Sequence, residues 1–144
     1  MTQAKLNLVA GLLVVSALIG GLFSASPAYA VNNPLIRTCM IALGTFETYP
    51  LGTDDMALCR WNKLIVDSQT LLSNLNGLNS EAASVILSNI TGTSCASVSA
   101  TDYTIPTGEV LCFFPDDSRL SLEGLKSGSS DSDRLHLKEV LSAR

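Results

Sequence analysis

The longest periodic pattern of apolar and polar residues in the chain falls between residues 53 and 78. Apolar side chains recur there at the spacing of one helix face, at Leu58, Trp61, Ile65, Leu72 and Leu75. A hydroxyl side chain followed by two carboxylates at 53–55 is typical of a helix start, and Asn76-Gly77 is typical of a helix end. The pattern therefore predicts an amphipathic helix over about 53–76, with Trp61 as a core residue.

Two shorter helices are predicted on either side of this segment. Residues 34–43 begin with a proline, which suits the first position of a helix. Asn79, Ser80 and Glu81 precede an apolar run that reaches about Ile90, which predicts a further helix there. The segment 44–52 contains a Tyr-Pro pair between two glycines, and we expect a loop.

The pattern changes after residue 100. Residues 102–105 and 109–114 are rich in β-branched and aromatic side chains, and Pro-Thr-Gly separates them, which predicts a short β-hairpin. Residues 127–132 have the Ser- and Gly-rich composition of a linker. We therefore expect 118–144 to be a flexible tail, with a short helix at 133–143 as its only candidate element.

Taken together, these elements predict a mainly α fold. It is a small disulfide-stapled helical domain of about three helices with a short C-terminal β-hairpin and a flexible tail. The predicted domain spans residues 31–117.

The N-terminal segment has the pattern of a secretory signal peptide. Lys5 precedes an apolar run over residues 8–25, and small residues occupy positions 28 and 30 of the sequence Ser-Pro-Ala-Tyr-Ala. This predicts a signal peptide over 1–30, cleaved after Ala30, and a mature form that does not span a membrane. An uncleaved membrane anchor is the alternative, because the apolar run approaches the ~20 residues that cross a bilayer.

All four cysteines follow the predicted cleavage site. An even number of cysteines in a small exported chain indicates two disulfides and an oxidising compartment: extracellular, periplasmic or another lumen. We favour Cys39–Cys59 and Cys95–Cys112, because the first pair would face each other across a helical hairpin. The nested pairing, Cys39 with Cys112 and Cys59 with Cys95, is the alternative.

The net charge and the mean hydropathy add two points to this interpretation. The 144 residues carry a net charge of −4, and removal of Lys5 with the signal would take it to −5, so the chain lacks the basic surface that nucleic acid requires. The mean hydropathy of +0.32 reflects mainly the apolar N-terminal run.

Residues for catalysis are scarce in this sequence. The single histidine, His136, has no neighbouring partner for a catalytic or metal-binding unit, and we interpret it as solvent-exposed. The spacing of the cysteines fits neither a redox motif nor a zinc site. We therefore predict a non-enzymatic protein with no cofactor and no metal. Asn89 begins an Asn-Ile-Thr triplet that could accept a glycan in a eukaryotic secretory pathway.

Two classes of function fit these properties. The first is a small secreted or periplasmic interaction or accessory protein, which binds another protein at the cell surface or in the export compartment. The second is a carrier that holds an apolar small molecule between its helices and the hairpin.

Overall fold

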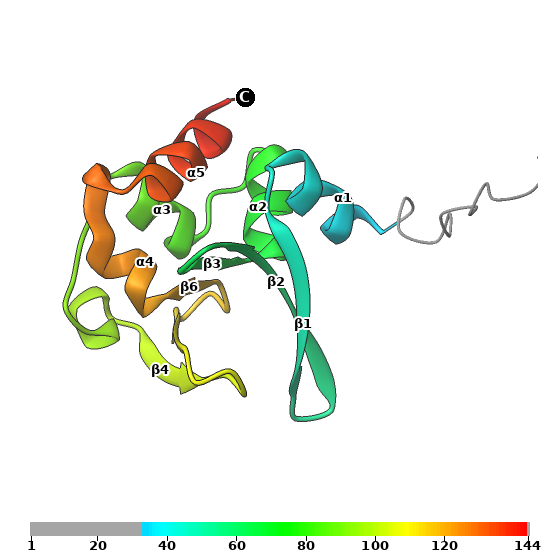
Figure 1. The fold of residues 1–144 in the computed structure, drawn as a ribbon, viewed down its shortest axis with the longest axis horizontal. Coiled ribbons are helices and arrows are strands. Elements are labelled where there is room, and N and C mark those ends of the chain that lie inside the picture. The colour runs from blue at the N-terminus through cyan, green and yellow to red at the C-terminus, as the bar shows by residue number, and fades with distance from the viewer. Residues whose placement is uncertain (1–32, 144) are drawn as a thin grey trace, which may run out of the picture.

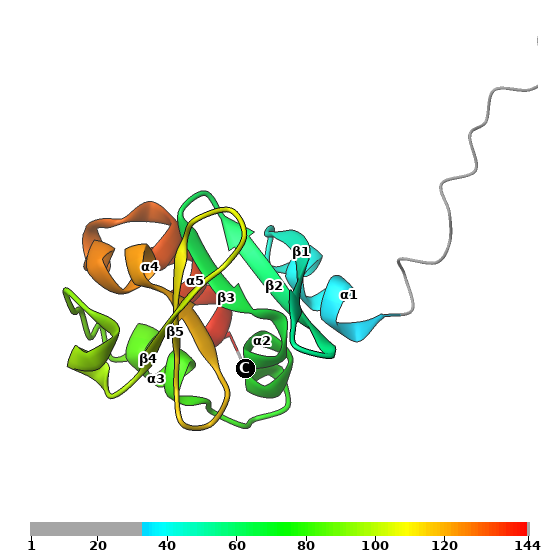
Figure 2. The same ribbon diagram turned by 90° about the horizontal axis from the view of Figure 1, so that it is seen from below.

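The computed structural model describes residues 33–143, so the predicted signal peptide and its cleavage site lie outside the described residues. Six strands form one antiparallel sheet in the order β1-β2-β3-β6-β5-β4. The sheet curls into a half-barrel, and helices cover its convex side (Figures 1 and 2). The chain is therefore an α+β protein, and the predicted mainly α fold is wrong.

The elements in chain order are α1 (Pro34–Ile41), β1 (Thr45–Leu51), β2 (Asp54–Trp61), β3 (Leu64–Asp67), α2 (Ser68–Leu75), α3 (Glu81–Leu87), the 3-10 helix η2 (Cys95–Val98), β4 (Thr101–Thr104), β5 (Val110–Phe113), β6 (Arg119–Ser121), α4 (Leu122–Ser127), the 3-10 helix η3 (Gly128–Ser130) and α5 (Ser132–Ser142).

The sheet consists of two antiparallel units that meet at its centre. The first unit is the β1-β2-β3 meander, in which two-residue turns join Leu51 to Asp54 and Trp61 to Leu64. The second unit is the β4-β5-β6 meander. A short pairing of β3 with β6 joins the two units and brings residues 66 and 120 together. The join is narrow, which lets the sheet bend strongly at this point.

The two faces of the curled sheet carry separate apolar cores. The larger core lies between the convex face and the helices, and its largest buried side chains include Trp61, Leu71, Ile86, Leu120 and Leu137. The smaller core fills the inside of the curl, with Met56, Leu58, Ile65, Ile105 and Leu111 at its centre. Successive residues of β2 alternate between the two cores, as side chains of a strand must.

The predicted helix over 53–76 is wrong in its first two thirds. Residues 54–67 form β2 and β3, and only Ser68–Leu75 is helical. All four residues of β3 are buried, because the strand lies at the centre of the sheet with a core on each face. A short apolar run of this kind does not distinguish a buried strand from a buried helix. The predicted end at Asn76-Gly77 is confirmed.

Residues 44–52, predicted as a loop, form β1 instead, which pairs with β2 along its whole length. Pro50 is tolerated because β1 is an edge strand of the sheet. The helices at 34–43 and from residue 81, the hairpin of β4 with β5 and the burial of Trp61 are confirmed.

The flexible tail expected at 118–144 is also wrong, because β6, α4, η3 and α5 lie between residues 119 and 142; the short helix expected at 133–143 is confirmed as α5. β6 is a central strand, and Leu125, Leu137 and Leu141 are buried in the larger core. Arg134 is 1% exposed and donates hydrogen bonds to backbone carbonyls of α3 and α4, among them Gly124 O at 2.7 Å and Val85 O at 3.2 Å. A buried arginine thus ties the C-terminal helix to the domain.

Candidate functional site

The C-terminal end of α1 holds a leucine in an unusual backbone conformation. Leu43 N–H donates to Met40 O and Gly44 N–H donates to Cys39 O, both at 3.0 Å, which is the hydrogen-bond pair of a Schellman motif. Leu43 therefore takes the left-handed position, with φ at 60°, where glycine is usual. The other described non-glycine residues with positive φ are Asn, Ser or Asp. Leu43 is thus a strained exception among them.

The glycine next to it is required for a different reason. A Cβ on Gly44 would clash with Cys59 Sγ and would lie 3.0 Å from the Trp61 ring. Glycine is therefore required at position 44 because α1 packs closely on the sheet there. The left-handed backbone conformation, which also favours glycine, occurs one residue earlier, at position 43.

Helix α2 ends in a second Schellman motif beside the first. Gly77, with φ at 79°, donates to Asn74 O at 3.0 Å, and Leu78 N–H donates to Ser73 O at 2.9 Å. Both motifs satisfy backbone groups at the helix ends, yet each leaves a leucine in solvent: Leu43 is 77% exposed and Leu78 is 66% exposed.

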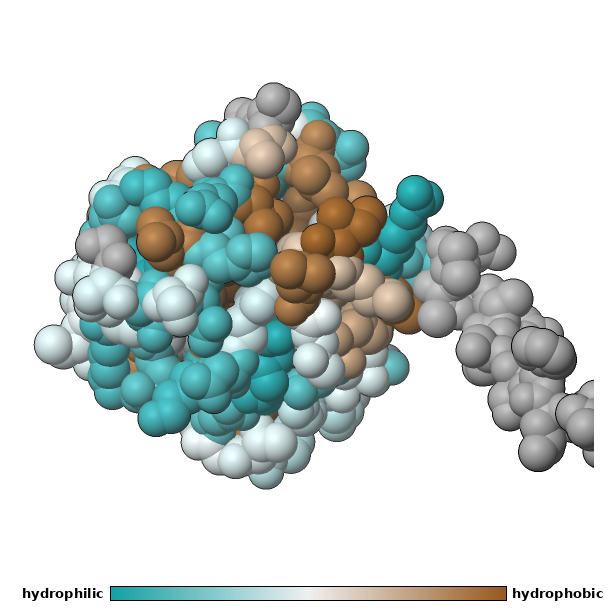
Figure 3. Space-filling model, turned by 45° about the horizontal axis from the view of Figure 1, so that its top comes forward, coloured by the Kyte–Doolittle hydropathy of each residue, from teal (hydrophilic) through white to brown (hydrophobic). Residues whose placement is uncertain are grey.

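These helix ends carry a continuous exposed apolar surface (Figure 3). We define the apolar face as the five large side chains that are each more than half exposed: Met40, Ile41, Leu43, Leu75 and Leu78. The segments that supply them, 38–46 and 68–80, contain no charged residue, although 15% of the chain is charged. Depletion of charge around exposed apolar side chains is the composition of an interface core.

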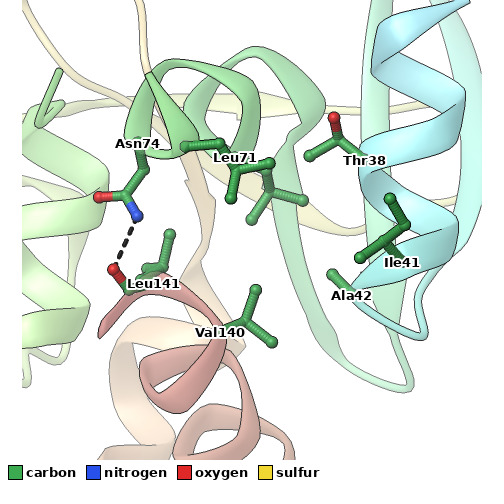
Figure 4. A pocket seen from close by; sticks show the side chains of 8 residues that line it. Thr38, Ile41, Ala42, Leu71, Asn74, Val140 and Leu141 are labelled. Carbon is green, nitrogen blue, oxygen red and sulfur yellow. Dashed lines mark hydrogen bonds between the residues drawn. The ribbon is translucent and has the colours of Figure 1, made fainter. Parts of the chain in front are cut away.

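A small pocket opens within this surface, between α1, α2 and α5 (Figure 4). Its volume is about 30 Å³, and it is lined by Thr38, Ile41, Ala42, Leu71, Asn74, Leu75, Val140 and Leu141. Its two polar side chains are bonded to the protein, since Thr38 Oγ1 donates to Pro34 O at 2.7 Å and Asn74 Nδ2 donates to Leu141 O at 2.7 Å. An apolar pocket of this size accepts the tip of one aliphatic side chain.

Helix α1 is fixed to the rest of the domain at the same end. The Cys39–Cys59 disulfide joins it to β2. The carbonyl of Ala42 accepts two hydrogen bonds of 2.9 Å, from Trp61 Nε1 and from His136 Nε2. Because a carbonyl can only accept, the bonded nitrogen of His136 carries the proton. The histidine predicted to be solvent-exposed is half-buried and helps to position the apolar face.

A cluster of charged residues closes the inside of the curl. Arg60 on β2 donates from Nε to Glu47 Oε1 at 2.8 Å and from Nη2 to Glu109 Oε2 at 2.7 Å, and its Nη1 pairs with Glu109 Oε1. Tyr49 also donates to Glu47, at 2.9 Å. The hydrogen bonds from Arg60 hold the pKa of Glu109 below its usual value. We call Glu47, Arg60 and Glu109 the ionic clasp, because it links the two units of the sheet.

A buried carboxylate supports the junction of β3, α2 and β6. Asp67 is 2% exposed and accepts hydrogen bonds from Thr70 N and Thr70 Oγ1, both at 2.7 Å, and from Arg119 N at 2.6 Å. Burial raises the pKa of Asp67, although these three donors favour the charged form. Each of its contacts caps a helix or joins strands, so we assign Asp67 to the architecture.

The predicted cysteine pairs are those of the structure, Cys39–Cys59 and Cys95–Cys112, and they indicate an oxidising compartment. The geometry expected for the first pair is wrong, because Cys59 lies on a strand rather than on the second helix of a hairpin. Asn89 is exposed after α3, and its glycosylation stays a prediction.

Within residues 33–143, no cluster of three or more His, Cys, Asp or Glu side chains is placed to hold a metal ion. None of the helices in the same range has the length and apolar character needed to cross a membrane. Comparison with known protein families, with curated proteins and with solved structures finds no match for this chain.

The sequence reasoning missed both the apolar face and the ionic clasp. The face has a signal in the sequence, the two charge-free segments, but their adjacency depends on a tertiary contact between α1 and α2. The clasp joins residues 13 and 49 positions apart, and it has no local signal.

Proposed function

We propose that this chain is an exported, non-catalytic interaction protein whose contact surface is the apolar face. Export rests on the predicted signal peptide over 1–30, and the two disulfides fit an extracellular, periplasmic or other oxidising compartment. Within that compartment the protein partner would cover Met40, Ile41, Leu43, Leu75 and Leu78.

One observation carries the proposal: Leu43 combines strain with exposure. A bulky residue at positive φ costs stability, and its side chain gains almost no burial in return because it is 77% exposed. Contact with another protein would recover that burial. A contiguous apolar patch that is depleted in charged residues is the expected surface for such contact.

The carrier alternative receives less support from the cavities. The apolar pocket between the helices has a volume of about 30 Å³, whereas small-molecule sites usually reach ~300–1,000 Å³. A depression of about 300 Å³ beside α4 has charged residues in its lining: Lys63, Glu109, Glu123 and Lys126. Neither matches a site for an apolar molecule.

Site-specific photo-cross-linking tests the proposal. A benzoylphenylalanine residue replaces Leu43 or Leu78 in one set of variants and Leu135 in the control, and the exporting cells are irradiated. Leu135 is 49% exposed on α5, where Lys138 and Glu139 are its neighbours at i+3 and i+4, so it is an apolar side chain outside the apolar face.

We expect protein adducts from positions 43 and 78 and none from position 135. Equal adduct yields at all three positions, or no adducts at any, would overturn the proposed function. Nile red uptake by the folded protein distinguishes the carrier: uptake that survives Leu43→Ser with Leu78→Ser would favour it.

A further inference from the structure

We propose that the occupant of the apolar face is a second copy of this chain, bound in a two-fold symmetric dimer. This inference rests on the proposed function, because it names the partner of the same surface. Three observations carry it: the area of the face, the presence of a projecting side chain and a pocket within it, and the distribution of charge.

The first observation is the area. The five side chains of the apolar face are each between 51% and 77% exposed. They amount to roughly 500 Å², near the upper end of the largest apolar patches found on monomers. A standard interface buries ~800 Å² on each partner. The face would therefore supply most of one side of such an interface, and the surrounding polar residues would supply its rim.

The second observation is that the face contains both a projection and a recess. A two-fold interface pairs the same patch on each copy, so the patch must be complementary to itself. Leu43 is the most exposed large apolar side chain of the described residues, and its backbone is fixed by the Schellman motif. The pocket begins at the neighbouring residues Ile41 and Ala42. Near a two-fold axis, Leu43 of each copy can enter the pocket of the other.

The pocket matches the tip of a leucine side chain in its chemistry. Most of its lining is aliphatic, and both polar side chains in it, Thr38 and Asn74, are hydrogen-bonded within the protein. An entering group therefore displaces no required hydrogen bond. A side chain that fills a well-packed pocket near the centre of an interface, where water is excluded, contributes a large share of the binding energy.

The third observation is the charge distribution. Two copies of the exported chain, with a net charge of −5 after removal of the predicted signal, repel each other on most of their surface. Segments 38–46 and 68–80 contain neither acidic nor basic residues. The segments that supply the apolar face thus place no like charges opposite each other when two acidic copies meet there.

Sedimentation equilibrium tests the dimer on the exported protein, purified with both disulfides formed, at concentrations from about 1 µM to about 1 mM, which cover the range of weak specific association. We expect the mass to rise from one chain to two with concentration. The double variant Leu43→Ser with Leu78→Ser should raise the dimer Kd at least tenfold, whereas the control Leu135→Ser should change it less than twofold. Because both variants alter exposed side chains, each should keep the thermal transition of the wild type at a concentration where the wild type is monomeric.

The outcomes separate the two proposals. A wild-type protein that stays monomeric, while position 43 cross-links to other proteins, overturns the dimer and leaves the proposed function standing. A monomer that also gives no adducts overturns both. A dimer that Leu43→Ser and Leu78→Ser leave unchanged overturns this assignment of the interface.

Discussion

The ionic clasp and the apolar face both lie where segments distant in sequence meet. They differ in their side chains, which are paired with one another in the clasp and exposed to solvent in the apolar face. In the clasp, Arg60 bonds to a carboxylate on β1 and to one in the turn before β5, and these partly buried charges satisfy one another within the chain. In the apolar face, α1 and α2 satisfy their backbone groups internally, yet five large side chains stay in solvent.

This difference separates a structural site from a binding site. A charged cluster is a common candidate for an active site, because side chains with perturbed pKa values are concentrated in active sites. Here the charges have partners within the fold, whereas residues 33–143 leave the side chains of the apolar face more than half exposed. The exposed apolar face is therefore a better indicator of function in this molecule than the charged cluster is.

Removal of either disulfide should have the largest effect on stability, but only one of the two disulfides holds a segment of the apolar face. Replacement of Cys39 and Cys59 by alanine should cost about 3 kcal/mol of unfolding free energy and release α1, which together with the turn after it carries three residues of the apolar face. Replacement of Cys95 and Cys112 should cost a similar amount, because the residue separations are 20 and 17. Urea unfolding measures the stabilities, and sedimentation measures association under conditions where each variant is folded.

Only the first pair of substitutions should impair dimerisation. An equal loss of dimer in both variants would contradict the local role given to α1.

The clasp should affect stability without affecting association. Arg60→Met leaves Glu47 and Glu109 without their cation in a partly buried site, and we expect a loss of about 2 kcal/mol in urea unfolding. Adding Glu47→Gln and Glu109→Gln to Arg60→Met should recover part of that loss, because the uncompensated charges are then removed. A raised dimer Kd in the single variant would show that the two regions are coupled.

Leu43→Gly should separate strain from binding. Glycine adopts the positive φ at no steric cost, so the variant should gain about 0.5–1 kcal/mol of stability after its greater unfolded-state freedom is counted. The same change removes the projecting side chain, so the dimer Kd should rise. Asn62→Gly is the matched control: asparagine tolerates this conformation, and little gain is expected. A loss of stability in Leu43→Gly would mean that the leucine side chain supports the monomer.

The smallest effect is the pH dependence of the clasp. The pKa of Glu109 lies below its usual value of 4.5, so its ion pair stabilises the fold above that pH and loses its contribution as pH falls through the lowered pKa. Asp67 acts in the opposite sense, because its raised pKa makes the fold relatively more stable at low pH.

The stability difference between wild type and Glu109→Gln, from urea unfolding at several pH values, should therefore shrink in acid, while the dimer Kd of both proteins changes together. A difference that grows in acid would contradict the role of Glu109.

The sequence allowed correct predictions where local signals decide the structure. Pro34 and Ser80 mark helix starts, and the Pro-Thr-Gly turn marks the β4-β5 hairpin. The cysteine pairs were also predictable, since pairing of neighbours in sequence needs only short loops. The charge-free segments around the apolar face were visible, although the pattern alone did not show that they adjoin.

The errors arise where tertiary contacts override local pattern. Leu58 and Trp61 share a helical stripe by spacing, yet on β2 they face opposite cores. The segment 127–132 has linker composition, but Arg134, buried against carbonyls of α3 and α4, orders the chain around it. A buried arginine bonded only to backbone has no signature in a single sequence.

The most direct test of the central claim is an isotope-filtered NOE measurement on an equal mixture of ¹³C-labelled and unlabelled protein. The symmetric dimer predicts intermolecular contacts between the methyl groups of Leu43 in one copy and those of Leu71 and Val140 in the other. Filtered spectra without these contacts, recorded at a concentration where sedimentation shows dimer, would contradict it.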